Sequence, residues 1–281
     1  MTKGNILITG ASTGIGAACV QKFAKEGYRV FGSVRKQVDA DQLKETVGAN
    51  FHPLIFDVTD QSAIQKAADY LAAELKESSL QLLINNAGIA VTGAAELLDV
   101  EAYRKQYEVN FFGLIAVTKA FLPLLGANEE NNSAPGKIIN MSSIASKRAM
   151  PFMTPYSSSK SAVDSFSEGL RREMMIYGID VVTINPGPIR TPIWDKIDVD
   201  TEQVRGTVYE PILKRFMKLV DKESSDAIDA NDFADKVFKT FLSKNPKVND
   251  VVIKKKFLKY DLLKLVPVRV LDGLIKKALK I

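Results

Sequence analysis

The chain has 281 residues, of which 46% are hydrophobic and 25% are charged, so it is long enough to bury a large core. With one cysteine, Cys19, and one histidine, His52, it cannot hold an internal disulfide framework and is a poor zinc protein, which favours a reduced, cytoplasmic setting. The start of the chain lacks the regions of a signal peptide and no apolar run reaches membrane-spanning length. We therefore expect a protein that is soluble or at most peripheral to a membrane.

Short β-branched segments alternate with longer segments of helical period. Strands are expected at 5–9, 28–34, 51–56, 81–85, 137–141 and 179–185, and helices at 14–26, 60–77, 100–125 and 156–176. Strands that are apolar on both faces and separated by helices imply a parallel sheet that is covered on both sides. We predict the α/β class: a doubly wound parallel sheet with right-handed crossovers and helices on both faces.

The pattern changes after the sixth expected strand. Pro186-Gly-Pro is followed by helical stretches at 201–221 and 230–243. In open parallel sheets ligands lie beyond the carboxyl ends of the strands, so an insertion here is well placed to cover a substrate. We expect one domain over 1–250 with a substrate lid at 188–225, and a basic amphipathic extension at 251–281 that packs on the domain.

A glycine-rich turn, Thr9-Gly-Ala-Ser-Thr-Gly-Ile-Gly16, closes the first strand and opens the first helix. Glycines let the backbone turn sharply and approach a pyrophosphate, which the free N–H groups of the helix N-terminus can bind. An ordinary glycine-rich turn is the alternative. The expected dinucleotide contacts are Gly10, Ser12, Thr13, Gly14, Ile15 and Gly16.

The end of the second strand indicates which dinucleotide is bound. An acid there would bind the ribose hydroxyls of NAD, whereas a cation accommodates the 2′-phosphate of NADP. The chain has Gly32-Ser-Val-Arg-Lys36 and no acid at this point. We therefore expect NADP (NADPH) rather than NAD, with Arg35 and Ser33 as contacts; the alternative is that Arg35 and Lys36 are solvated loop charges.

Tyr156 and Lys160 lie four residues apart, which places a phenol and an ammonium on one helix face. Moving a tyrosine pKa from about 10 to about 7 requires roughly 4 kcal/mol of phenolate stabilisation, a scale that adjacent cations can supply. We expect Lys160 to lower the pKa of Tyr156. Taken alone, this spacing also occurs by chance in many helices.

Five motifs occur in order: Thr-Gly-x-x-x-Gly-x-Gly at 9–16, Asn85-Asn-Ala-Gly88, Ser143, Tyr156-x-x-x-Lys160 and Pro186-Gly187. Their combination resembles the short-chain dehydrogenase/reductase family, and the three residues between Gly10 and Gly14 resemble its compact single-domain branch. The resemblance implies a Rossmann fold, a nicotinamide cofactor and redox chemistry between alcohols and carbonyls.

The resemblance also assigns roles to single residues. Asn110 matches the residue that holds a proton-relay water through its backbone, and Ser143 matches the serine that binds the substrate oxygen, with Ser142 as the less favoured neighbour. Tyr156 and Lys160 complete the catalytic set. The cofactor contacts carried over from the family are Asp57, Val58, Asn86, Ala87, Gly88, Tyr156, Lys160, Pro186, Gly187, Ile189 and Thr191.

These catalytic residues are sufficient for the reaction. Reduction of a ketone builds negative charge on its oxygen, where a donor and a proton must be placed. Ser143 is expected to donate and Tyr156 to protonate; in the reverse direction the tyrosinate removes the hydroxyl proton. No metal and no histidine is required, and His52, which lies between Phe51 and Pro53, is interpreted as structural.

The expected substrate is a lipophilic small-molecule alcohol or carbonyl compound. Apolar side chains flank the catalytic residues and begin the lid: Ile144, Ala149, Met150, Phe152, Met153, Ile193 and Trp194. Such a wall suits an apolar substrate, and the local sequence resembles steroid and retinol dehydrogenase-like members of the family. Core packing is the alternative for several of these residues.

The segment 251–281 contains eight lysines and one arginine against two aspartates. Leucines and isoleucines at helical spacing predict an amphipathic helix pair that is broken near Pro267 and packs its apolar stripe on the domain. The alternative is a peripheral contact with an anionic membrane surface. Nucleic acid is not an expected partner, because the tail has few aromatic side chains that could stack on bases.

Two interpretations without catalysis compete with the enzyme: an NADP-binding redox sensor and a membrane-associated scaffold. The complete set of catalytic residues favours the enzyme. The family resemblance also suggests a homodimer or homotetramer built partly on the helix at 156–176.

Overall fold

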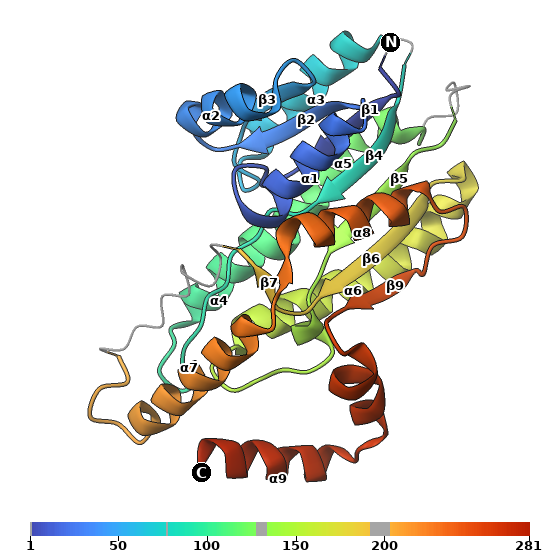
Figure 1. Cartoon of the computed structure of the whole chain (residues 1–281). Coiled ribbons are helices and arrows are strands. Elements are labelled where there is room, and N and C mark those ends of the chain that lie inside the picture. The colour runs from blue at the N-terminus through green and yellow to red at the C-terminus, as the bar shows by residue number, and fades with distance from the viewer. Residues whose placement is uncertain (1, 77, 128–133, 192–202) are drawn as a thin grey trace.

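Seven parallel strands form the centre of the molecule, in the order β3-β2-β1-β4-β5-β6-β9 (Figure 1). The computed structural model describes residues 2–76, 78–127, 134–191 and 203–281. The strands are β1 (Asn5–Ile8), β2 (Arg29–Val34), β3 (Phe51–Ile55), β4 (Leu80–Asn85), β5 (Lys137–Met141), β6 (Asp180–Pro186), β7 (Ile189–Arg190), β8 (Ile228–Asp229) and β9 (Asn249–Val252). The helices are α1 (Gly14–Lys25), α2 (Gln37–Val47), α3 (Gln61–Leu75), α4 (Val100–Tyr107), α5 (Gly113–Phe121), α6 (Thr154–Glu173), α7 (Tyr209–Ser225), α8 (Ala230–Leu242) and α9 (Val268–Leu279).

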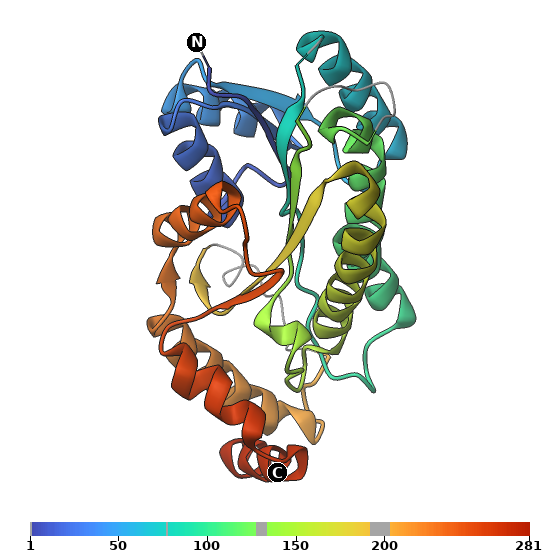
Figure 2. The ribbon, with the colours of Figure 1, turned by 90° about the vertical axis from the view of Figure 1, so that its right-hand side faces the viewer.

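Helices cover both faces of this sheet, as the two views together show (Figure 2). Ile6 and Ile8 belong to a buried layer that includes Phe23 of α1 and Phe233 of α8. Leu7, which points to the other face, belongs to a second layer formed with α3, α5 and α6. Successive side chains of one strand thus pack into the two cores on opposite faces of the sheet. The predicted doubly wound sheet is confirmed.

The six expected strands are found to within one residue at each end. The sequence did not predict α2, β9 or the small parallel pair of β7 and β8. Because β9 pairs with β6 and runs from Asn249 to Val252, the sheet extends two residues past the expected domain limit at 250.

The helix expected over 100–125 is interrupted. It consists of α4, a π-helical turn η1 (Glu108–Phe112), α5 and a 3₁₀ turn η2 (Leu122–Leu125). The run Val100–Leu125 has the length and apolar composition of a membrane span, and Val117, Phe121 and Leu125 pack completely buried in the second core layer. Part of its apolar surface is therefore packed within the fold.

The C-terminal segment leaves the sheet after β9 and forms η5 (Phe257–Asp261), η6 (Leu262–Leu265) and α9. Pro267 precedes α9, as the predicted break requires. Leu279 is fully buried in an apolar cluster with Leu213 and Phe216 of α7, and Arg215 Nη1 donates to the Leu279 carbonyl at 2.9 Å. The end of α9 is thereby attached to α7.

Candidate active site

The predicted site residues come together at one edge of the sheet. The glycine-rich turn follows β1, Asn86 follows β4, Ser143 follows β5, and Pro186 ends β6. Carboxyl ends of parallel strands share an edge, and the strand order reverses between β1 and β4, which is where open α/β sheets bind ligands.

The turn after β1 has the shape of a phosphate cradle. Gly10 and Gly14 have φ of +64° and +59°, and a Cβ on Gly16 would stand 2.2 Å from the Gly10 carbonyl oxygen. Thr13 precedes α1 without capping it through its side chain, and the first turn holds no acid. The N–H groups at the start of α1 are therefore available to an anion, and the positive end of the helix dipole attracts one.

Hydrogen bonds hold the glycine-rich turn against the segment after β4. Asn86 Nδ2 donates to the carbonyls of Thr9 (3.0 Å) and Gly10 (3.1 Å), and Thr9 Oγ1 accepts from the backbone N–H groups of Asn86 and Ala87, both at 3.0 Å. Asn86 and Ala87, expected as cofactor contacts, thus shape the turn. Gly88 lies beside the Lys160 ammonium, which would be 3.6 Å from a Cβ at that position.

The ends of β2 and β3 carry the expected adenosine contacts. Arg35 Nη1 lies 3.9 Å from Asp57 Oδ2, and the Arg35 side chain is 71% exposed and free to reorient. Val58 is buried against Gly113. The Ser33 side chain is buried and its Oγ accepts from Gly10 N at 3.1 Å, so it supports the glycine-rich turn. Its contact with a cofactor stays a prediction.

Tyr156 and Ser143 meet at the centre of the site. The Ser143 side chain lies next to the Tyr156 hydroxyl, while Ser142 Oγ donates to the Lys160 carbonyl at 3.1 Å and so is committed to the α6 backbone. This arrangement favours Ser143 over Ser142, as predicted. Burial raises the pKa of Tyr156, and the neighbouring Ser143 side chain opposes that rise. The net shift of the Tyr156 pKa is therefore upward, opposite to the expected lowering.

Lys160 lies one helical turn further along the same face. Its Nζ is 5.9 Å from the centre of the Tyr156 ring and donates to the Met141 carbonyl at 2.8 Å. Burial lowers the pKa of Lys160 from 10.5 to about 8, against an opposing contribution from the nearby Asp164 carboxylate. The ammonium thus lies beside the phenol, as the spacing predicts, but directs its hydrogen bond to the end of β5.

Asn110 is the central residue of the π-helical turn η1 and is 1% exposed. Its amide exchanges two hydrogen bonds with Ile89, accepting from the N–H at 2.8 Å and donating to the carbonyl at 3.0 Å. Gln106, one turn earlier, also donates to the Ile89 carbonyl and accepts from Val91 N–H. These two amides fix the segment after β4, and π-turns of this kind are frequent at functional sites.

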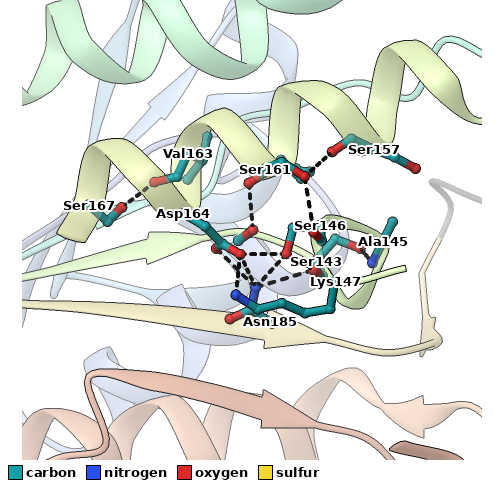
Figure 3. Close-up of polar contacts among 12 residues, drawn as sticks. Ser143, Ala145, Ser146, Lys147, Ser157, Ser161, Val163, Asp164, Ser167 and Asn185 are labelled. Carbon is teal, nitrogen blue, oxygen red and sulfur yellow. Dashed lines mark hydrogen bonds and ion pairs between the residues drawn. The ribbon is translucent and has the colours of Figure 1, made fainter. Parts of the chain in front are cut away.

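A polar cluster that the sequence analysis missed lies behind Ser143 (Figure 3). Asp164 of α6 accepts from Asn185 Nδ2 at 3.0 Å and from Ser146 Oγ at 2.5 Å, and forms an ion pair with Lys147 at 2.6 Å. Asn185 Nδ2 also donates to the Ser143 carbonyl at 3.2 Å, as Ser146 Oγ does at 2.7 Å. The cluster therefore fixes the Ser143 backbone. Its one sequence signal is the position of Asp164, four residues after Lys160 on α6.

The apolar residues around the catalytic groups divide into two sets. Phe152 and Met153 are buried in the cluster formed with α7, to which the Tyr156 ring also belongs, so the core-packing alternative holds for them. Phe152 has φ of +66°, a conformation rare outside glycine, and its carbonyl accepts from Gly93 N–H at 2.8 Å. Ile144 and Met150 are half-buried and Ala149 is exposed. Ile193 and Trp194 lie outside the described residues.

The segment after β6 faces the glycine-rich turn. Thr191 lies against Gly14, where its Cβ would be 3.1 Å from a Cβ added to the glycine. Gly187 N–H donates to the Val252 carbonyl of β9 at 2.9 Å, and Ile189 is buried where β7 pairs with β8. Pro186 to Thr191 is thus fixed by β9 and β8 at the same edge as the other candidates.

The other titratable residues that the structure describes do not form a metal site. Within the described ranges no three His, Cys, Asp or Glu side chains are grouped as metal ligands. Cys19 is buried, which raises the pKa of its thiol to about 12, and His52 accepts from Arg29 Nε at 3.3 Å, with its pKa lowered by burial. Both have structural roles.

Comparisons with known proteins agree with this geometry. The short chain dehydrogenase family model matches residues 4–202. An NADPH-dependent 3-dehydrocapnine reductase from Ornithobacterium rhinotracheale is 40% identical, over 98% of this chain and 96% of the relative. A 3-ketodihydrosphingosine reductase from Bacteroides thetaiotaomicron is 32% identical, over 86% of this chain and 84% of the relative.

A solved structure is similar over almost its whole length. The short chain dehydrogenase from Burkholderia cenocepacia in complex with NADP superposes with a TM-score of 0.72 at 26% identity and covers 98% of both chains. The family model spans well over half of the chain, and the two relatives are 40% and 32% identical over 98% and 86% of it. The chain belongs to the short-chain dehydrogenase family of oxidoreductases.

Proposed function

We propose that this protein is an NADPH-dependent reductase of a lipophilic ketone, with Tyr156 as the proton donor. The observation that carries the proposal is the placement of Ser143 and of the Lys160 ammonium beside the buried Tyr156 phenol, with Lys160 Nζ 5.9 Å from the ring centre. The same groups can run the reaction in reverse, from a secondary alcohol to a ketone.

The pKa of Tyr156 favours the reductive direction. Burial raises it, so the phenol holds its proton at neutral pH and can transfer it to the oxygen of a bound carbonyl. Ser143 donates a hydrogen bond to the same oxygen, where charge develops. A nicotinamide cofactor supplies the hydride when bound. Lys160, with a pKa of about 8, is mostly cationic at pH 7 and favours negative charge on the phenol after proton transfer.

The residues that would hold the cofactor fit a dinucleotide that carries a 2′-phosphate. The turn at Gly10 to Gly16 accepts the pyrophosphate, and Arg35 stands at the end of β2 where an acid would select NAD. The reductase from O. rhinotracheale is NADPH-dependent by name, which supports the same choice. We therefore assign NADP as the cofactor.

The substrate class follows from the wall around Tyr156 and from the relatives. Ile144 and Met150 are half-buried beside the catalytic groups and offer an apolar surface with few groups that could bind a strongly polar substrate. Both relatives are named for reduction at carbon 3, of 3-dehydrocapnine and of 3-ketodihydrosphingosine. We propose 3-dehydrocapnine or a similar lipophilic 3-ketone as the substrate, with steroids and retinoids as the alternatives that the local sequence suggests, and 188–225 as its lid.

A substrate panel tests the proposal. Purified protein is mixed with NADPH and, in separate reactions, with 3-dehydrocapnine, 3-ketodihydrosphingosine, estrone, retinal and a small water-soluble ketone, and the loss of NADPH absorbance is followed. We expect the fastest turnover with a lipophilic 3-ketone. Turnover of none of these carbonyls, although NADPH binds, would instead support a redox-sensing role.

Substitution of Arg35 tests the cofactor assignment. In Arg35→Ala the cation at the end of β2 is lost, so KM for NADPH should rise by one to two orders of magnitude, the scale of one charge-assisted phosphate contact. KM for NADH should change little. Equal changes for both cofactors would show that Arg35 does not read the 2′-phosphate. Lys244→Ala, an exposed lysine far along the chain, is the control.

We also propose a cytoplasmic homodimer or homotetramer built partly on α6. Met175 and Ile176, just beyond the end of α6, are 61% and 78% exposed, which supports a subunit contact at this end of the helix. The mass in solution, measured by light scattering, tests this assembly, and a monomer at micromolar concentration would contradict it.

A further inference from the structure

The C-terminal segment presents large apolar side chains to solvent although the domain core is already complete. They line η5, η6 and α9, and each is between 45% and 82% exposed. We name this set, together with the cations described next, the tail surface. Its apolar members are Phe257, Leu258, Leu262, Leu265, Val268, Val270, Leu274 and Ile281.

Basic side chains flank these apolar residues. Lys255, Lys256 and Lys259 form ion pairs with acids of the domain. Among the described residues, no carboxylate pairs with the remaining cations of the segment, which complete the tail surface: Lys254, Lys264, Arg269, Lys276, Lys277 and Lys280. The segment 251–281 has a net charge of +7, whereas the whole chain has +5. The rest of the protein is therefore slightly acidic, and the positive charge is concentrated here.

The exposed apolar side chains of α9 are not the ones that attach this helix to the domain. Ile275 and Leu279, four residues apart, face the domain and belong to the cluster with α7. Val270 and Leu274 form a second stripe, also four residues apart, that is 53% and 54% exposed. One stripe is enough to attach the helix, so the second stripe has no partner among the residues that the structure describes.

We propose that the tail surface docks on an anionic lipid bilayer. Exposed leucines beside unpaired lysines are the composition of a helix that lies in the membrane interface, where apolar groups enter the acyl boundary and cations meet the headgroups. A second copy fits less well, because a symmetric interface would place this positive surface against itself. The surface lies at the end of the molecule opposite the N-terminus, where it can approach a plane (Figures 1 and 2).

The position of the tail surface has a consequence for a lipophilic substrate, and this consequence rests on the proposed function. Leu279 and Ile275 of α9, Phe216 of α7 and the Tyr156 ring all belong to one apolar cluster. A protein docked through α9 would hold the catalytic edge close to the bilayer. A ketone dissolved in the membrane would then reach Tyr156 without crossing bulk water.

Vesicle flotation tests the docking without requiring any turnover. The full chain is mixed with vesicles of phosphatidylglycerol and phosphatidylcholine in equal parts, or of phosphatidylcholine alone. We expect binding to the mixed vesicles that weakens as salt is raised, and little binding to phosphatidylcholine. Failure to float with the mixed vesicles at low salt would overturn the proposal, whatever the panel of ketones shows.

Two sets of variants separate the apolar and the charged contributions. Leu258→Ser with Leu265→Ser and Leu274→Ser, and separately Lys276→Glu with Lys277→Glu, should each weaken vesicle binding roughly tenfold or more. Leu242→Ser with Val248→Ser, and Lys244→Glu with Lys247→Glu, are matched exposed controls and should bind as the wild type does. All four should retain turnover of a water-soluble ketone.

The solution mass of the variant with the three leucine substitutions tests the alternative that a second copy of the chain covers the tail surface. If it changes from an oligomer to a monomer while vesicle binding is unaltered, the tail surface is a subunit interface and the proposal is wrong. An unchanged mass together with lost vesicle binding supports the bilayer.

Discussion

Lys160 is a buried cation whose protonation is linked to stability. Its pKa is about 8 in the folded protein and 10.5 ordinarily, so between these values the unfolded chain binds more protons and stability rises with pH. Below about pH 8 the full cost of the buried charge is present, on the order of 3 kcal/mol. In Lys160→Met this contribution is absent.

We therefore predict that the free energy of unfolding of Lys160→Met exceeds that of the wild type most near pH 7. This difference should shrink towards pH 10. Urea unfolding at both pH values measures the difference, and Cys19, whose raised pKa is due to burial and does not involve Lys160, cancels from it. A stability difference that is independent of pH would show that the pKa of Lys160 is the same in the folded and the unfolded protein. The same variant should be inactive.

Asp164 has a positioning role that can be tested apart from the chemistry. In Asp164→Asn an amide replaces the carboxylate that accepts from Asn185, Ser146 and Lys147. The new NH2 group then faces other hydrogen-bond donors. The free energy of unfolding should fall by about 1–3 kcal/mol. Because the cluster holds the Ser143 carbonyl, kcat should fall ten- to a hundredfold while KM for NADPH stays constant. Asp221→Asn, an exposed acid of α7, is the control.

A loss of stability in Asp164→Asn with normal kcat would assign the cluster to folding alone. Its members come from three places in the chain: η3 (Ile144–Ser146) with the adjoining Lys147, α6 and β6. Sequence reasoning found Ser143 and Tyr156 because their spacing is a motif. It missed Asp164 and Asn185 because nothing in their local pattern shows that the fold brings them together.

At the scale of elements, close approach of α1 to the turn after β1 depends on Gly16. A methyl group there would meet the Gly10 carbonyl at 2.2 Å and Asn86 Nδ2 at 2.7 Å. Gly16→Ala should therefore destabilise the fold by about 1–3 kcal/mol and weaken NADPH binding, because α1 or the turn must move.

Gly169 is the matched control for this substitution. It lies within α6, where nothing stands within 4 Å of an added Cβ, so Gly169→Ala should stabilise the protein by about 0.5–1 kcal/mol. Thermal unfolding and NADPH titration of the two variants measure both effects. Equal effects would mean that the contact between α1 and the turn does not constrain position 16.

Strands and helices were predicted correctly where buried apolar residues recur at a regular spacing along the chain. They were missed where such residues are few. The strands β1 to β6 have apolar runs on both faces and were predicted to within one residue. The helix α2 was missed because it buries few side chains, Ala40 and Leu43, within a polar sequence. The strand β9 begins with Asn249 and Asp250, which read as a loop, and the extra residue of the π-turn at Asn110 leaves no mark in the periodicity.

At the scale of the molecule, three apolar clusters perform different tasks. Two lie on opposite faces of the sheet and hold the strands that precede the glycine-rich turn and Ser143. The third joins the Tyr156 ring to α7 and α9 and connects the chemistry to the C-terminal end. The sequence predicted the first two from strand and helix periodicity. It predicted the third only as a choice between core and substrate wall, because which side chains α7 covers depends on how the chain returns after β6.

The most direct test of the account is turnover by Tyr156→Phe, in which the ring that packs in the third cluster remains and only the hydroxyl is removed. With NADPH and the best ketone of the panel, kcat should fall by at least about 10³, at the upper part of the range for loss of a general acid. NADPH binding, measured by the change in its fluorescence, and the unfolding midpoint should stay close to those of the wild type. Turnover within a factor of a few of the wild type would contradict the assignment of Tyr156 as the proton donor.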